Sequence, residues 1–170
     1  MPTILVALGA LFLVSAAQGQ AATFLTFGRS CGFPGSPVPS LGATGVPQLG
    51  TVFTVTYRGP NAIEPGLGLT DQPLLMIGVV RVDLPFPLIN PVQPTGCTLY
   101  PSPDVIVVPP PDAGGRAFVA QVAFSIPNDP GLIGGSLFLQ WAVPHTQCYF
   151  IGCGLGWVSF SEGGEAILGT

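Results

Sequence analysis

Residues 116–143 constrain the fold most strongly, because they contain two long runs of apolar side chains with a period of two. In the first run every second residue from Phe118 to Ile126 is apolar, and in the second run every second residue from Leu137 to Val143. This period, with β-branched and aromatic residues, is typical of β-strands. Neither run has a strongly polar face. We therefore expect a central hairpin of a β-sandwich, with both strands covered on two sides.

The connection between these two runs predicts a short helical turn. Asp129 is a good helix N-cap, and Pro130 suits the first helical position because its φ is already helical and it lacks an N–H. Gly134 and Gly135 then give the backbone the freedom to enter the next strand.

The composition supports many short strands in one domain. The chain has 170 residues, of which 48% are hydrophobic, and it also contains 24 Gly and 20 Pro. So many apolar residues argue against disorder, while the Gly and Pro residues supply turns. We predict an all-β fold, an antiparallel β-sandwich of about eight short, disulfide-tied strands, with residues 22–170 as a single domain.

Further strands are indicated by shorter apolar or alternating runs. These runs comprise residues 22–28, 51–58, 74–84, 97–100, 105–108, 155–160 and 165–168. In residues 51–58 the side chains Phe53, Val55 and Tyr57 share one face, which predicts a half-exposed strand near a sheet edge. Gly78 predicts a bend in its strand. Residues 29–48 and 144–154 are expected to be loops.

The first 21 residues resemble a secretory signal peptide. Residues 4–14 form an apolar run that is too short to span a bilayer, and small residues follow it. Cleavage after Gly19 and cleavage after Ala21 both fit this pattern. The start of the chain lacks a basic side chain, and the alternative is a buried first strand. We expect an exported protein, secreted or at the cell surface, with no transmembrane segment in the mature chain.

Charged residues are scarce, at 7% of the chain, and there is no Lys. The net charge of −4 and the scattered Arg residues argue against nucleic-acid binding. So little charge predicts an apolar surface that packs against other surface proteins or against further copies of the chain. The alternative is that Ser, Thr, Gln, Asn and the backbone make the surface polar enough.

Four cysteines in an exported chain predict two disulfides, for which three pairings exist. Cys148 and Cys153 are close in sequence and make a natural local clip, which leaves Cys31 to pair with Cys97. A rival interpretation is a metal site formed by His145, Cys148 and Cys153. A structural zinc ion requires four N or S ligands, and the chain has no C-x-x-C pair, so we predict no metal site.

Residues able to carry catalysis are few. His145 is the single histidine and is expected in a solvated loop, without a nucleophile elbow nearby in sequence. Four carboxylates are candidates for acid–base pairs, but charges that keep turns hydrated are the favoured explanation: Asp104, Asp112, Glu162 and Glu165. Calcium at Asp104, Asp112 or Asn128-Asp129 lacks the spacing of a calcium loop. We predict no catalytic residues and no cofactor.

Aromatic residues near the C-terminal end offer a possible ligand-binding surface. Trp157, Tyr149 and Phe150 are the candidates for stacking on a sugar ring. Trp141 alternates with Leu139 and Val143 and is predicted to lie in the core.

Three segments together resemble a known family: FGRSCGFPGSPVPSLGATGVPQLGTVFTVTY, GCTLYPSPD and IPNDPGLIGGSLFLQWAV. In that order they are similar to small secreted bacterial β-domains of unknown function that are abundant in planctomycete-type genomes. The positions that match the pattern are Cys31, Cys97, Asn128, Asp129, Pro130 and Gln140. The resemblance covers nearly all of the mature chain. It implies a Cys31–Cys97 disulfide and no known activity, with Cys148 and Cys153 as an addition.

Three functions are then open. The first is a secreted, non-catalytic β-sandwich with a structural or interaction role at the cell surface, in an extracellular matrix or in a filament. The second is a carbohydrate-binding module, and the third is a secreted hydrolase that uses His145 or loop carboxylates. An open sheet edge or an apolar patch would favour assembly, whereas a row of exposed aromatic residues would favour glycan binding.

Overall fold

The computed structural model describes residues 19–32, 38–59, 72–86, 96–110, 119–149 and 152–170, with the backbone alone for residues 146–149 and 152–153. Within these ranges the secondary structure is almost entirely β, so the predicted all-β class is confirmed. Eleven strands are described, more than the eight or so expected. They are β1 (Thr23–Phe27), β2 (Ser40–Thr44), β3 (Val52–Arg58), β4 (Leu74–Gly78), β5 (Arg81–Pro85), β6 (Thr98–Pro101), β7 (Val105–Val107), β8 (Val119–Ser125), β9 (Ser136–Tyr149), β10 (Gly152–Phe160) and β11 (Gly163–Ile167).

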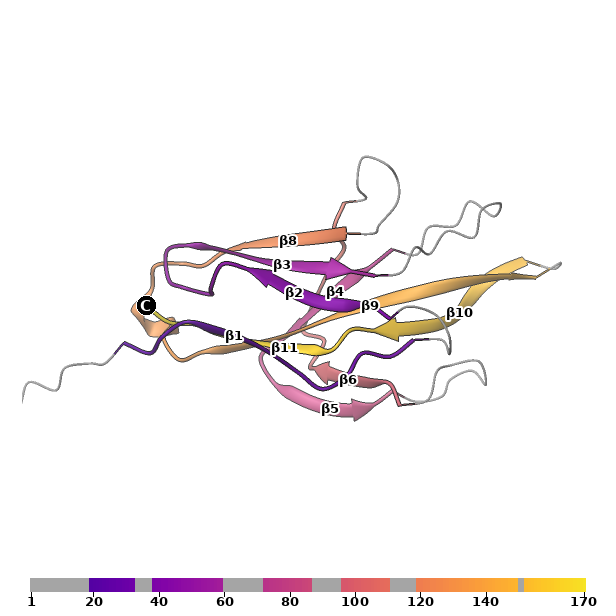
Figure 1. The fold of residues 1–170 in the computed structure, drawn as a ribbon, viewed down its shortest axis with the longest axis horizontal. Coiled ribbons are helices and arrows are strands. Elements are labelled where there is room, and N and C mark those ends of the chain that lie inside the picture. Colours follow the sequence, from indigo (N-terminus) through magenta and orange to yellow (C-terminus); the bar gives the residue numbers. More distant parts are fainter. Residues whose placement is uncertain (1–18, 33–37, 60–71, 87–95, 111–118, 150–151) are drawn as a thin grey trace, which may run out of the picture.

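The strands form three antiparallel sheets that lie in layers (Figure 1). The middle sheet has the order β1-β11-β9-β4-β7, and β10 also pairs with β9. A three-stranded sheet, β2-β3-β8, covers one face of it, and the small β5-β6 sheet lies on the other side. This is a β-sandwich with an additional small layer.

The main core lies between the middle sheet and the three-stranded sheet. Phe53, Val55 and Tyr57 are buried, as their alternation in β3 predicts. Trp141 of β9 is fully buried against them, with its ring centroid 5.6 Å from that of Tyr57. Its Nε1 donates to the carbonyl of Thr56 at 3.1 Å. The predicted core position of Trp141 is confirmed.

A second, smaller core lies on the opposite face of the middle sheet. It contains the Cys31–Cys97 disulfide, packed with Met76, Ala142 and Phe160. The two cysteine Cα atoms are 5.3 Å apart, and the bridge spans 66 positions of sequence. The predicted Cys31–Cys97 pair is therefore confirmed. Because β9 is buried on both faces, it needs apolar residues at successive positions, which its sequence provides.

The predicted hairpin within residues 116–143 is wrong, although both of its strands exist. β8 pairs with β3 in the three-stranded sheet, whereas β9 pairs with β4, β10 and β11 in the middle sheet. The connection therefore carries the chain from one layer to the other. Period-two alternation identifies strands and their faces, but it does not specify their partners.

The helical turn in that connection is confirmed. A 3-10 helix spans Pro130–Leu132, and the Asp129 Oδ1 accepts a hydrogen bond of 2.9 Å from the N–H of Gly131. Pro130 stands at the start of the helix, as its fixed φ favours.

Other boundaries differ from the sequence prediction. Residues 74–84 form two strands, β4 and β5, because the chain turns at Val79 and Val80 and leaves the middle sheet. The predicted loop 29–48 contains β2, so β3 lies between β2 and β8 and is not an edge strand. The predicted loop 144–154 is largely the continuation of β9 and β10.

Candidate functional site

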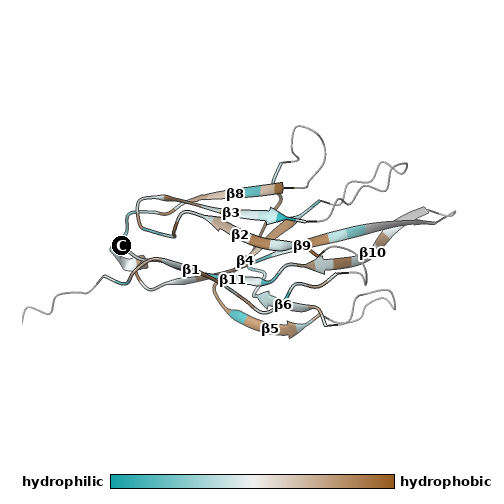
Figure 2. Cartoon of the chain, viewed as in Figure 1, coloured by the Kyte–Doolittle hydropathy of each residue, from teal (hydrophilic) through white to brown (hydrophobic). Residues whose placement is uncertain are grey.

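Exposed aliphatic side chains gather at one edge of the middle sheet. We name this cluster the β7 patch, and its members are Val79, Val80, Val105, Ile106 and Val108. Each of them has roughly half or more of its surface exposed, from 53% for Val105 to 65% for Val79. Figure 2 shows that strongly hydrophilic segments are few and short over the described chain.

Local hydrogen bonds bring the two parts of the β7 patch together. The N–H of Ser102 donates to the carbonyl of Val80 at 2.8 Å, and the N–H of Val79 donates to Asp104 Oδ2 at 3.0 Å. These bonds fix the β4–β5 turn beside the start of β7. On the other side, Ile106 lies opposite Met76 in the pairing of β7 with β4.

β7 is the last strand of the middle sheet among the described residues, so one side of its backbone faces outward. Unpaired N–H and C=O groups at such an edge can add a further strand. Proteins often protect an edge with Lys, but this chain has none. The carboxylate of Asp104, which directly precedes β7, accepts hydrogen bonds from the N–H of Val79 and from the Ser102 hydroxyl. The edge is limited by its length of three residues and by flanking prolines, Pro103 and Pro109.

Of the candidate aromatic residues, Tyr149 and Trp157 lie on a projecting arm made of β9 and β10. Within the described chain, β4 pairs with β9 only as far as Ala142, and β9 beyond this point pairs with β10 alone. Figure 1 shows the two strands extending well past the ends of β2 and β3. The described residues of the predicted loop 144–154 thus belong to a two-stranded ribbon.

His145 is buried in the arm, at 8% exposure, so its prediction as a solvated loop residue is wrong. Its Nε2 lies 2.7 Å from the Ser159 Oγ, and its ring stacks on that of Trp157 with centroids 4.9 Å apart. Cross-strand pairing explains this, because Trp157 is the direct partner of His145. A histidine beside a serine hydroxyl is also the arrangement of a nucleophile and its base. Ser159 is only 2% exposed, however, so a substrate cannot reach its hydroxyl in this structure.

The other predicted residues of the arm are placed by backbone alone. Cys148 and Cys153 are direct partners across the two strands, and Tyr149 lies opposite Gly152. This register agrees with a local Cys148–Cys153 clip, whose bond stays a prediction because these side chains lie outside the described residues. Phe150 also lies outside them. The structure brings Trp157 onto His145, which covers one face of its indole.

The carboxylates considered for acid–base chemistry do not form pairs in the described chain. Glu162 Oε1 accepts from the N–H of Leu41 at 3.2 Å, and Glu165 Oε1 accepts from the Ser136 hydroxyl at 2.9 Å. Asp112 lies outside the described residues. Among the described residues, no three His, Cys, Asp or Glu side chains come close enough together to hold a metal ion.

An open hollow of about 460 Å³ lies beside β1 and β2. Arg29 and Glu162 are its charged residues. The residues that line the hollow come from segments far apart in sequence. The hollow could therefore not be predicted from the sequence. Its lining also includes Thr26, Phe27, Gly28, Ser30, Val38, Pro39 and Ser40.

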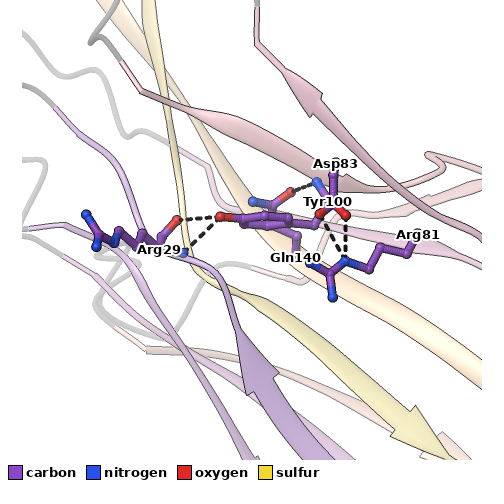
Figure 3. A network of polar contacts seen from close by, with 5 residues as sticks. All are labelled: Arg29, Arg81, Asp83, Tyr100 and Gln140. Carbon is purple, nitrogen blue, oxygen red and sulfur yellow. Dashed lines mark hydrogen bonds and ion pairs between the residues drawn. The ribbon is translucent and has the colours of Figure 1, made fainter.

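Buried polar groups near this hollow form a structural network (Figure 3). Gln140 is fully buried, and its Oε1 accepts from the N–H of Tyr100 at 3.0 Å. Its Nε2 donates to the carbonyls of Thr98 and Ser161, each at 2.9 Å. The Tyr100 hydroxyl in turn accepts from the N–H of Arg29 at 2.9 Å. These bonds join β6 and the segment after β1 to β9.

Comparisons of the chain with protein-family models, with curated proteins and with solved structures find no significant match. The resemblance to small secreted bacterial β-domains therefore stays a prediction. In the described residues, no helix has the length and apolar character needed to cross a membrane.

Proposed function

We propose that this chain is an exported, non-catalytic β-sandwich domain that associates with further copies of itself through the β7 patch. Such a domain would serve as a structural or interaction unit at the cell surface, in an extracellular matrix or in a filament. The predicted signal peptide and the oxidised Cys31–Cys97 pair support export, because disulfides persist in oxidising compartments.

The observation that carries this proposal is the kind of apolar side chain left exposed. Of the twelve large apolar side chains that are exposed in the described residues, all are aliphatic and five belong to the β7 patch. The described aromatic side chains are buried or half-buried. Aliphatic side chains around an open strand edge suit pairing with another strand, whereas a sugar platform requires exposed aromatic faces.

A second copy of the chain is the partner that this edge fits best. Two β7 strands can pair antiparallel about a two-fold axis, so that each copy offers the same short strand and the same aliphatic side chains. In an antiparallel pairing centred on Ile106, each Ile106 would meet its copy and each Val105 would lie opposite Val107. The two Asp104 carboxylates, each hydrogen-bonded within its own chain, would then lie at opposite ends of the contact. Burial of this apolar surface would drive association.

The test is sedimentation velocity of the mature protein over a range of concentrations. We expect association that strengthens with concentration, that is lost in Ile106→Lys and that persists in Val52→Lys. Val52 is a matched control because it is 59% exposed but lies on β3 in the other sheet. Strictly monomeric wild-type protein, or equal behaviour of the two variants, would contradict the proposal.

A further inference from the structure

The first described residues of the chain are fitted against its C-terminal end. The carbonyl of Gln20 accepts a hydrogen bond of 3.0 Å from the N–H of Thr170. Gly169 packs so closely that any side chain there would overlap the backbone of Gln20 and Ala22. The last residues are themselves held, because Leu49 donates to the carbonyl of Gly169 at 2.9 Å.

The side chain of Gln20 also has a defined place. Its Oε1 lies beside Gly134, at 2.8 Å from the point where a Cβ would stand. Gly134 has a φ of +82°, which favours glycine and keeps this space free. Gln20 is nevertheless exposed to solvent. Gln20 is therefore in contact with two glycines and with the C-terminal end, and Gly19 before it also packs against Thr170.

This placement favours one of the two cleavage positions that the sequence leaves open. Cleavage after Gly19 places small residues, Ala17 and Gly19, at the third and first positions before the cut. Cleavage after Ala21 fits the same rule with Gly19 and Ala21, but it would remove Gln20 and its bond to Thr170. Resting on the proposed export, we propose that the signal ends at Gly19 and that the new N-terminal Gln20 cyclises to pyroglutamate.

The cyclisation is balanced without any oxidant or cofactor. The neutral α-amino nitrogen of Gln20 attacks the Cδ of its own side-chain amide and forms a five-membered lactam. The bond from Cδ to the amide nitrogen breaks, a proton passes from the α-amino group to that nitrogen, and ammonia leaves. The Gln20 carbonyl takes no part in the reaction, so its bond with Thr170 is kept.

The modification has an unusual chemical consequence in this chain. Because the sequence contains no Lys, the α-amino group of Gln20 would be the single primary amine of residues 20–170. Its conversion to a lactam leaves residues 20–170 with no primary amine. Aminopeptidases could then not degrade the mature protein from its N-terminus, and amine-directed reagents could not cross-link it. Both properties suit a long-lived extracellular component.

Expression of the full chain in a bacterium, followed by two measurements on the purified protein, tests this proposal. The reduced sample should have the mass of residues 20–170 less one ammonia. An amine-reactive ester dye should not label it under denaturing conditions. The Gln20→Ala variant is the control: it keeps Gly19 before the cut, cannot cyclise, and should take up one dye per chain.

Other outcomes would overturn the proposal in distinguishable ways. A mature chain that starts at Ala22 would show that the Gln20 contacts do not set the cleavage position. A chain that starts at Gln20, with its ammonia retained and one dye bound, would refute cyclisation. A cell-retained protein that still carries residues 1–19 would instead refute the proposed export.

Discussion

At the scale of single residues, the interior of this protein depends on a few polar groups whose hydrogen bonds are well matched. Gln140 is the clearest of them, because one fully buried side chain bonds three backbone groups on two other segments. A buried polar group is costly only when it lacks partners. The hydrogen bonds of Gln140 therefore join the middle sheet to β6. An apolar residue at this position could only fill the space.

The Gln140→Leu substitution should test this. It leaves the N–H of Tyr100 and the carbonyls of Thr98 and Ser161 without their partner, and each such loss costs about 1–3 kcal/mol. We expect the free energy of unfolding in urea to fall by about 3 kcal/mol or more. Gln121→Leu, at an exposed site on β8, should change it by less than about 0.5 kcal/mol. Equal effects of the two substitutions would refute the role of Gln140.

The sequence predicted burial correctly for residues whose environment follows from the alternation of their neighbours in the chain. Trp141 was placed in the core because it alternates with Leu139 and Val143, and it is fully buried. His145 was misplaced because it follows Pro144 and precedes polar residues, a pattern that resembles a loop. Its burial comes from Trp157 and Ser159 on β10, and no local pattern reveals that pairing.

At the scale of secondary-structure elements, the connection from β8 to β9 determines how the layers join. It crosses from the three-stranded sheet to the middle sheet and contains the capped 3-10 helix. The turn residues were predictable because a cap and a proline act locally. The sheet exchange was not, because strand partners depend on contacts made along the whole chain.

Asp129→Ala should weaken this connection. The Asp129 carboxylate accepts the N–H of Gly131, and loss of a cap usually costs about 1 kcal/mol. We expect a decrease of that size in the free energy of unfolding, measured in urea. Asn128→Ala, a neighbouring exposed substitution, serves as the control and should have a smaller effect. A stability unchanged by Asp129→Ala would show that the cap does not contribute.

The two predicted disulfides should differ in how much they stabilise the fold. In the chain-entropy model the bridge between Cys31 and Cys97 closes a long loop and should stabilise by about 4 kcal/mol, against about 2 kcal/mol for the short Cys148–Cys153 clip. Paired Cys→Ser variants, compared by urea unfolding, should therefore differ about twofold in their loss of stability. A larger loss from the clip variant would contradict this order. Detection of free thiols at Cys148 and Cys153 in the native protein would disprove the clip.

At the scale of the whole molecule, the sequence predicted the fold class and the β-sandwich, but not the order of the strands or the additional layer. Alternation, together with Gly and Pro turns, indicated a β-sandwich, which the structure confirms. The additional β5-β6 layer, the projecting β9–β10 arm and the β7 patch were not predictable in detail. Each depends on which strands end early and which continue, and those limits are decided by tertiary pairing.

The β7 patch connects this architecture to the proposed function. The chain has 7% charged residues and no Lys. It therefore has few charges that could prevent the open edge of one copy from pairing with the same edge of another copy. The proposed assembly uses that edge, and the His145–Ser159 pair of the arm is buried in this structure.

The most direct test is amide hydrogen exchange of the mature protein at low and high concentration, followed by mass spectrometry of its peptides. If copies pair through β7, peptides that contain Val105–Val107 should exchange more slowly at high concentration. The Ile106→Lys variant should show no such slowing. Exchange in β7 that is independent of concentration, in a sample that associates, would place the contact elsewhere and contradict the account.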